Sequence, residues 1–278
     1  GFVPFARQQP RLWPAALVFC CLYMYITFAW DIWWYGGSLG QRAMVQSYPV
    51  WALALAALVE WAFRQKRVFQ ASFFVTAALL IWYNFWLTHH AHKGGLLKVG
   101  EMTKAYFWKI LGKSEVEKNA IKLLDTKDEV RSERQNVVLL YSNDFEADSV
   151  RCPVPAIAGN NSMYLDETRQ SSPVFNIPLP EGEARWIRAT ARFRCEQKEW
   201  DVWKMTQWVV RFSNKGQRVK ENMIRIYRLL DSGQTRELYI DAKLPKKPFD
   251  RIEVFFWNAG SLKLLLVDDL QVESFTVK

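Results

Sequence analysis

The sequence predicts a protein of two parts: a membrane segment of three transmembrane helices, followed by an all-β, jelly-roll-like sandwich. Three long apolar runs lie within residues 12–88, and short stretches of alternating apolar and polar residues fill 136–278. Residues 1–100 hold only eight Lys and Arg and two Asp and Glu. We therefore expect a transmembrane region at 1–93, an amphipathic helical connector at 94–135 and the sandwich at 136–278.

The three apolar runs have the length of membrane spans. Residues 12–30 and 68–88 carry no charge, and each is long enough to cross a bilayer core as a helix. Residues 43–63 form a weaker third span, with Pro49 near its start and Glu60 near its end. The alternative is a set of buried helices in a soluble protein, which is less favoured because soluble helices seldom lack a polar face over such lengths.

Basic residues orient these spans. Arg7 and Arg11 precede the first span, and "RQKR" (64–67) joins the second to the third. Because Lys and Arg are enriched in cytoplasmic loops, both sites are expected on the cytoplasmic side. Three crossings then place everything after residue 88 outside. In a bacterium this predicts an inner-membrane protein with its C-terminal domain in the periplasm.

The segment "WWYGGSLGQRAMVQSYPVWALALAALVE" (33–60) carries a family resemblance. It resembles a membrane region of bacterial multi-spanning glycosyltransferases of the protein-mannosyltransferase-like, GT-C type, with aromatic residues, Tyr-Gly-Gly-Ser, Gly-x-Arg and a Tyr-Pro that opens the next helix. The resemblance implies transfer of a sugar from a polyprenyl-phosphate carrier to a glycan acceptor. It also implies that this chain is the C-terminal part of such an enzyme, without the catalytic acidic loop, so no catalytic residue is assigned.

The same segment holds the candidate lipid-phosphate site. Arg42 lies beside glycines at the expected membrane surface, where its guanidinium could bind a phosphate with two parallel hydrogen bonds. Gln41 and Tyr48 could add neutral hydrogen bonds, and Asp31 could orient the arginine. In the alternative interpretation, Arg42 only anchors a helix end among the phosphates of membrane lipid.

Two acidic stretches bracket the predicted sandwich. "NDFEAD" (143–148) and "VDDL" (267–270) resemble the jelly rolls of carbohydrate-binding modules, in which such residues lie on adjacent strands and in several families hold a structural calcium ion. A hard cation prefers several carboxylate and carbonyl oxygens at one point. The candidate ligands are Asp144, Glu146, Asp268 and Asp269. Solvated acids in turns are an equally weighted alternative.

Aromatic residues and amides in the sandwich are candidates for glycan binding. The predicted contacts are Trp200, Trp203, Trp208, Trp257 and Asn258. Most aromatic residues in a sandwich belong to its core, and this alternative stays open for each of them. Cys152 and Cys195 both belong to the predicted periplasmic domain, where a disulfide between them could persist.

Two function classes remain, and two others are disfavoured. The first is the C-terminal part of a glycosyltransferase with a glycan-recognising sandwich. The second is a non-catalytic, membrane-anchored carbohydrate-binding protein or a subunit of an envelope complex. Nucleic acid is not an expected partner, because the net charge of +9 is spread over finely mixed charges rather than one basic face. A soluble glycosidase is disfavoured, because no carboxylate pair stands out from the turn acids.

Overall fold

The computed structural model describes residues 1–29, 42–98 and 100–278, except for the side chain of Arg42. The whole Tyr-Gly-Gly-Ser motif (35–38), together with Asp31 and Gln41, lies outside the described residues. The chain divides into two compact units, which are described separately. The first comprises residues 1–102 with 110–115, and the second comprises 103–109 with 116–278.

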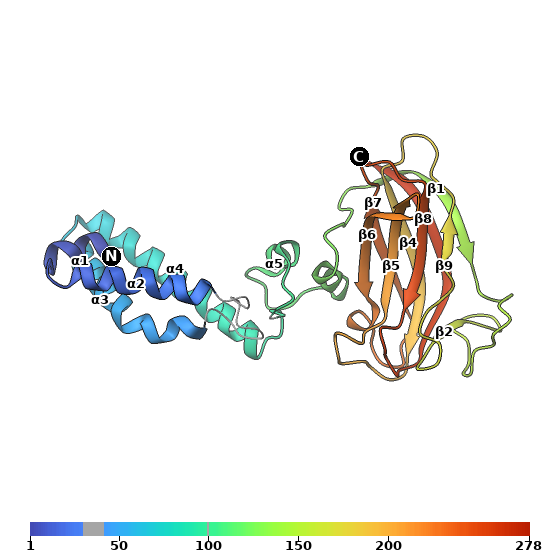
Figure 1. The fold of residues 1–278 in the computed structure, drawn as a ribbon, viewed down its shortest axis with the longest axis horizontal. Helices are drawn as coiled ribbons and strands as arrows, with labels where there is room; N and C mark the ends of the chain where they lie inside the picture. The colour runs from blue at the N-terminus through green and yellow to red at the C-terminus, as the bar shows by residue number, and fades with distance from the viewer. Residues whose placement is uncertain (30–41, 99) are drawn as a thin grey trace. The chain divides into compact units, whose positions relative to one another are not determined.

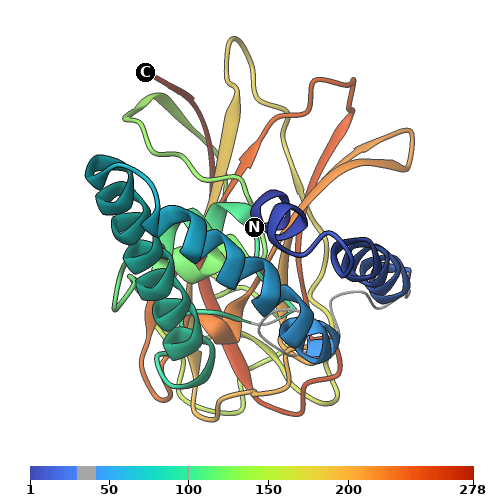
Figure 2. The same ribbon diagram turned by 90° about the vertical axis from the view of Figure 1, so that its left-hand side faces the viewer.

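The first unit is helical. It contains α1 (Phe2–Gln8), α2 (Trp13–Phe28), α3 (Tyr48–Phe63) and α4 (Arg67–His92), and the 3-10 helix η1 (Arg42–Ser47) leads directly into α3 (Figures 1 and 2). Pro14 and Pro49 lie in the first turns of α2 and α3. Proline is tolerated there because the first amide groups of a helix have no carbonyl partner within it.

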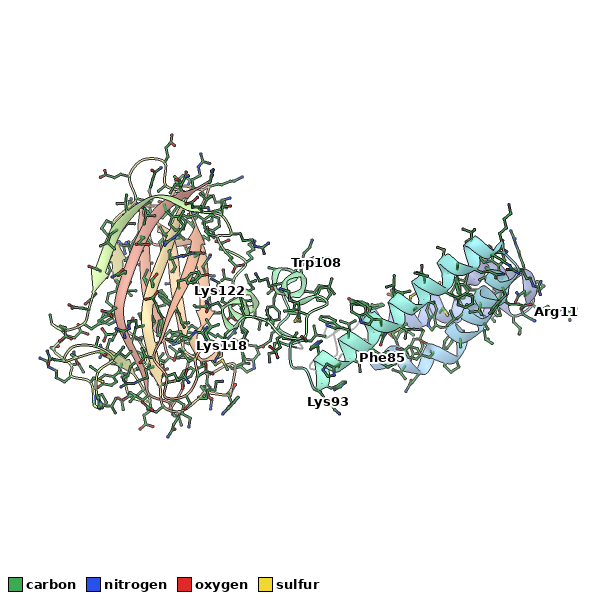
Figure 3. All side chains as sticks on the ribbon, turned by 180° about the vertical axis from the view of Figure 1, so that it is seen from behind. Arg11, Phe85, Lys93, Trp108, Lys118 and Lys122 are labelled. Carbon is green, nitrogen blue, oxygen red and sulfur yellow. The ribbon has the colours of Figure 1, made fainter. Side chains whose placement is uncertain are left out.

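Two of the predicted spans are confirmed as candidates by length and composition. They are residues Ala43–Phe63, which include η1 and α3, and Arg67–His92, which form α4. Large apolar side chains of α4, Phe85 among them, are exposed along the helix (Figure 3). A helix with so much exposed apolar surface is compatible with membrane association, because lipid tails solvate apolar side chains better than water does.

The predicted span at residues 12–30 is wrong. The described helix α2 has 16 residues, from Trp13 to Phe28. At 1.5 Å per residue it is about 24 Å long, whereas the hydrocarbon core of a bilayer is about 30 Å thick. The uncharged stretch 12–30 has the length of a membrane span, but the helix α2 covers only Trp13–Phe28 of it.

The second unit contains the predicted β-sandwich, which is confirmed as two antiparallel sheets. The first sheet has the order β1–β9–β4–β7, with β2 also paired to β9, and the second has the order β3–β8–β5–β6 (Figure 1). The strands are β1 (Arg134–Asn143), β2 (Met163–Leu165), β3 (Phe175–Ile177), β4 (Trp186–Cys195), β5 (Gln207–Asn214), β6 (Gln217–Arg225), β7 (Arg236–Lys243), β8 (Arg251–Trp257) and β9 (Leu265–Val277). The 3-10 helix η3 (Ile226–Arg228) follows β6.

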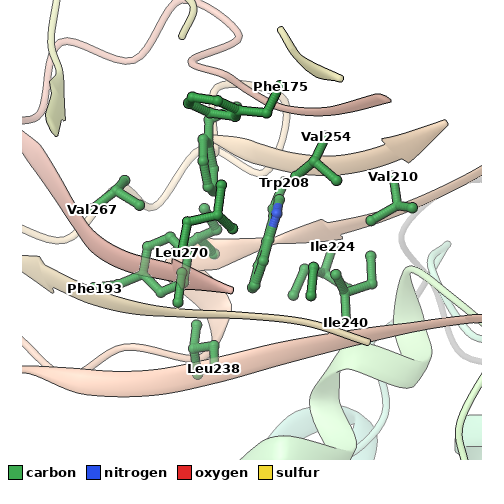
Figure 4. Packing of buried hydrophobic residues seen from close by; sticks show 14 of the residues in the cluster. Phe175, Phe193, Trp208, Val210, Ile224, Leu238, Ile240, Val254, Val267 and Leu270 are labelled. Atoms are coloured by element: carbon green, nitrogen blue, oxygen red, sulfur yellow. The ribbon is translucent and has the colours of Figure 1, made fainter. Parts of the chain in front are cut away.

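The core lies between the two sheets. In β4 the burial alternates along the whole strand, with Ile187, Ala189 and Phe193 among the buried residues, as the sequence predicts. Trp208 of β5 lies in the middle of this core, with ring centroids 5.2 Å from Phe193 and 5.6 Å from Phe256 (Figure 4). The two sheets are therefore joined by a continuous layer of apolar side chains.

Part of the expected connector packs against the sandwich. The connector contains α5 (Lys104–Ile110) and the 3-10 helix η2 (Lys118–Leu124). Lys122 of η2, labelled in Figure 3, is buried. Its Nζ lies 3.4 Å from the centre of the Tyr239 ring. Burial lowers the pKa of Lys122 to about 8, although Asp241 and Glu129 oppose this shift.

A buried ion pair lies beside this lysine. Arg188 of β4 donates to both carboxylate oxygens of Asp241 on β7, at 2.7 and 2.9 Å. The backbone N–H of Val130 donates to the same carboxylate at 3.0 Å. Because the Asp241 side chain is fully buried, one carboxylate joins both strands and the connector.

Candidate functional site

Two exposed tryptophans lie on the loop between β4 and β5, which leads from the first sheet to the second. Trp200 and Trp203 are 79% and 77% exposed. Carboxylates hold the loop backbone: Glu199 Oε1 accepts from the N–H of Trp200 at 2.9 Å, and Asp201 Oδ1 accepts from the N–H of Trp203 at 3.0 Å. The local sequence thus fixes the backbone while both indoles stay in solvent.

A third exposed tryptophan lies at the same end of the sandwich. Trp257 is the last residue of β8, is 47% exposed and pairs with Gln207 at the start of β5. Glu199 Oε2 accepts a hydrogen bond from Ser261 Oγ at 3.1 Å, which ties the β4–β5 loop to the loop after β8. We call Trp200, Trp203 and Trp257 the tryptophan end.

Two predicted glycan contacts, Trp208 and Asn258, are wrong, because both residues are fully buried. The alternation of β5 directs Trp208 into the core. Asn258 instead supports the tryptophan end: its Nδ2 donates to the carbonyl oxygens of Asp166 and Ser261, and its Oδ1 accepts from Thr206 Oγ1. Asn258 therefore holds three loop segments together and does not face a ligand.

Three of the four predicted calcium ligands have partners outside the group, whereas Asp144 Oδ1 accepts from the backbone N–H of Glu146 at 3.2 Å. Glu146 accepts from the N–H of Asn160 at 2.8 Å, and Asp269 pairs with Arg192 at 3.1 Å. Buried Asp268 accepts from Ser162 Oγ at 2.7 Å. Burial raises the pKa of Asp268. Its hydrogen bonds from the Ser162 hydroxyl and from the backbone N–H groups of Asp269 and Ala158 oppose this shift.

Asp144 and Asp269 do share a polar pocket of about 340 Å³, lined by Ser142, Asn143, Asp144, Asp269, Leu270 and Gln271. In the described part of the chain, no group of three or more His, Cys, Asp or Glu residues could hold a metal ion. Glu146 and Asp268 do not line the pocket, so the four acids do not meet at one point. Calcium binding stays a prediction from the sequence.

The predicted lipid-phosphate site is described only in part. Arg42 begins η1, and Tyr48 begins α3 with an exposed ring. Tyr48 lines an apolar groove of about 510 Å³ in the helical unit, together with Gly1, Phe2, Trp51, Ala52, Ala54, Leu55 and Leu58. The structure thus places one of the four candidates at an apolar groove, and the phosphate site stays a prediction.

Both cysteines of the predicted disulfide are free thiols in the structure. Cys195 points into the core, where burial raises its pKa to about 11. The loop that follows Cys152 reaches the other face of β4, where Arg194 Nη1 donates to the carbonyl of Ala156 at 3.3 Å. The segment after Cys152 therefore meets the face of β4 opposite to the buried Cys195 side chain.

Apart from Trp257, which is a predicted glycan contact, the outer face of the second sheet carries residues that the sequence analysis did not identify. The buried residues of β8 alternate with Arg251, Glu253, Phe255 and Trp257, which face outward. Arg211 of β5 also lies on this face, with its guanidinium carbon 4.8 Å from the centre of the Phe255 ring. The alternation in "RIEVFFW" could have grouped the four β8 residues, but their pairing with β5 required the structure.

Comparisons with known proteins do not assign this chain to a family. No family model matches, and no curated protein matches. Among solved structures, a family 16 carbohydrate-binding module is 14% identical, and the match covers 42% of this chain and 79% of that chain with a TM-score of 0.33. The CBM22-1 xylan-binding domain from Paenibacillus barcinonensis Xyn10C is 8% identical. That match covers 51% of this chain and 97% of the xylan-binding domain, with a TM-score of 0.32.

A Stig cyclase from Fischerella sp. TAU has the same TM-score of 0.32 and is 9% identical. The match covers 55% of this chain and 81% of the cyclase chain. Proteins with different activities thus resemble this chain to the same small extent. These similarities are too low to identify a family or a function, so the functional argument depends on the residues of the chain.

Proposed function

We propose that this protein is a membrane-anchored carbohydrate-binding protein whose β-sandwich binds a glycan at the tryptophan end. The observation that carries the proposal is the exposure of Trp200, Trp203 and Trp257 at one end of the sandwich. Large apolar side chains in such a group favour a ligand that covers them. The C–H faces of a sugar ring pack against the electron-rich face of an indole, and the sugar hydroxyls stay available for hydrogen bonds.

The helical unit would anchor this sandwich. In the proposal, α3 and α4 cross the membrane, and the basic linker 64–67 lies on the cytoplasmic side. The residues after α4 then lie on the outer side, which is the periplasm if the membrane is a bacterial inner membrane. This orientation needs only the one hairpin and its basic linker, so it does not depend on a span in α2.

The glycan proposal can be tested by removing two indoles. In the full chain in detergent, Trp200→Ala/Trp203→Ala is expected to weaken binding to soluble polysaccharides by about tenfold or more, because each stacked ring contributes about 1 kcal/mol. Affinity electrophoresis in gels that contain xylan, hydroxyethyl cellulose or polygalacturonate measures the retardation. Trp108→Ala is the matched control, since Trp108 is also exposed but lies in α5.

Retardation that the double variant keeps would contradict the proposed role of the tryptophan end. An equal loss in Trp108→Ala would do the same, because it would show that any exposed tryptophan of the chain contributes equally. Unchanged urea midpoints for the three proteins would show that the comparison concerns binding and not folding.

A second function is favoured by the groove at Tyr48. We infer that this chain is part of a glycosyltransferase that uses a polyprenyl-phosphate-linked sugar, as the resemblance of residues 33–60 implies. The groove is lined almost entirely by apolar side chains along α3, which suits the chain of a polyprenyl lipid. Tyr48 lies at the start of α3, directly after η1, which begins at Arg42. In this proposal the phosphate binds at Arg42.

Native mass spectrometry with polyprenyl phosphate tests this second function. Arg42→Ala is expected to lower the bound fraction about tenfold, because a charge-assisted contact to phosphate is lost. Arg64→Ala is the control, since Arg64 lies just beyond the other end of α3 and pairs with Glu60. Equal binding by the wild type and Arg42→Ala would exclude the phosphate-binding role.

A further inference from the structure

The outer face of the second sheet divides into an aromatic half and a basic half. Strand pairing places Trp257 beside Gln207, and Phe255 beside Val209, in neighbouring rows next to the tryptophan end. The next rows place Arg211 between Glu221 and Glu253, and then Ser213 between Arg218 and Arg251. Successive rows on one face of a strand are about 7 Å apart, so rings and guanidinium groups adjoin.

Two glutamates hold the arginines of this face. Glu221 accepts from Arg211 Nε at 2.7 Å and from Arg218 Nη1 at 3.3 Å. Glu253 accepts from Ser213 Oγ at 3.0 Å and lies 3.7 Å from Arg251 Nη1. We call Arg211, Arg218 and Arg251 the arginine group. Its side chains are held in place by groups of the same sheet before any ligand arrives.

The arginines lie further out than the glutamates that hold them. The side chains of Arg211, Arg218 and Arg251 are 37%, 65% and 59% exposed, whereas those of Glu221 and Glu253 are 26% and 16% exposed. Among the described residues, Arg211 uses Nε for Glu221, and its two Nη groups remain as donors. A ligand that approaches this face therefore meets guanidinium groups first.

The basic excess of the sandwich is concentrated in this region. Residues 211–221 and 243–253 hold eight Lys and Arg against three Asp and Glu. The whole of residues 134–278 holds 22 Lys and Arg against 19 Asp and Glu. Two of these lysines lie elsewhere, since Lys220 pairs with Asp128 of the connector and Lys243 belongs to β7 of the first sheet. Without them the two segments carry +3, as much as the entire range, so the rest of the range is close to neutral. The potential at this face favours an anion.

We propose that the ligand of the sandwich is an anionic glycan that carries carboxylate or phosphate groups. This proposal rests on the proposed carbohydrate-binding function and specifies the class of glycan. The sugar rings pack on the aromatic half, and the anionic groups accept hydrogen bonds from the arginine group, whose planar guanidinium matches a carboxylate or phosphate. The stack of Arg211 on Phe255 places the two kinds of contact side by side.

A matched pair of polymers tests the charge requirement. Polygalacturonate and its fully methyl-esterified form share one backbone and differ in carboxylate charge. The full chain in detergent is expected to bind polygalacturonate about tenfold more tightly at low salt, and added salt should reduce this difference. Arg211→Gln/Arg218→Gln is expected to remove the preference for polygalacturonate, so that this variant binds the two polymers equally.

Arg134→Gln is the matched control. Arg134 lies on β1 of the first sheet and pairs with Glu273 at 2.8 Å, with side-chain exposures of 33% and 27%. These values are close to those of the Arg211–Glu221 pair, at 2.7 Å with 37% and 26%. Arg134→Gln should keep the preference for polygalacturonate, and its urea midpoint shows whether loss of one such pair affects folding.

The possible outcomes separate this inference from the proposed function. Tryptophan-dependent binding that is equal for both polymers would leave the function standing and overturn the anionic specificity. Failure to bind any polysaccharide would contradict both. Vesicles of phosphatidylglycerol and of phosphatidylcholine test a lipid surface as the ligand. If the arginine variant lost only its binding to phosphatidylglycerol vesicles, the anionic-glycan proposal would be overturned in favour of a lipid surface.

Discussion

Replacing Asp241 by alanine is expected to lower the free energy of unfolding of the sandwich by about 3–5 kcal/mol. The variant leaves Arg188, which is largely buried, without its carboxylate partner, and it leaves the N–H of Val130 without an acceptor. It also removes the carboxylate that most strongly stabilises the charged form of the buried Lys122. Urea unfolding of the full chain in detergent, followed by pulse proteolysis, measures the loss.

Glu237→Ala provides the control for Asp241. Glu237 lies on the same strand, four residues away, but is exposed, and its removal should change the stability by no more than about 0.5 kcal/mol. The double variant Arg188→Met/Asp241→Leu is expected to be more stable than Asp241→Ala, because no unpaired buried charge remains. If Asp241→Ala and Glu237→Ala unfolded at the same urea concentration, the inferred role of the buried pair would be incorrect.

Replacing Trp208 by alanine is expected to cost about 3–5 kcal/mol, because it opens a cavity in the middle of the core. Trp208 is fully buried, and its ring contacts Phe193 of the first sheet and Phe256 of the second. Neighbouring side chains cannot fill the space without leaving their own contacts. The same urea measurement detects the change as a lower midpoint.

Trp200→Ala is the matched control for Trp208, since it removes the same side chain from an exposed loop. Its stability should stay within about 0.5 kcal/mol of the wild type. The two variants should show opposite patterns: Trp208→Ala is unstable, whereas Trp200→Ala is stable and weakened in glycan binding. A stable Trp208→Ala protein would show that the core between the two sheets does not depend on this ring.

The regular elements could be predicted from local patterns. Alternation in residues 186–195 correctly gave the buried and exposed sides of β4, because successive side chains of a strand point to opposite faces. The apolar runs at 43–63 and 68–88 gave two helices long enough to cross a membrane. The run at 12–30 was overestimated, since composition reports where a chain is apolar but not where the helix ends.

The candidate site could be predicted only in part. Trp200, Trp203 and Trp208 lie within nine residues of one another, and composition alone gave all three the same role. The structure separates them, since Trp208 lies on a strand whose inward side is set by its pairing with β6 and β8. Trp200 and Trp203 lie on a loop that short-range hydrogen bonds hold in solvent.

The partners of the acidic residues were decided by the tertiary structure. Asp268 binds Ser162, 106 residues earlier in the chain, and Asp269 binds Arg192, 77 residues earlier. The sequence by itself determined the period of each element, because that period depends on neighbours along the chain. Which distant side chains pair, and which aromatic residues stay exposed for a ligand, depends on segments that meet only when the two sheets pack, and no local pattern contains that information.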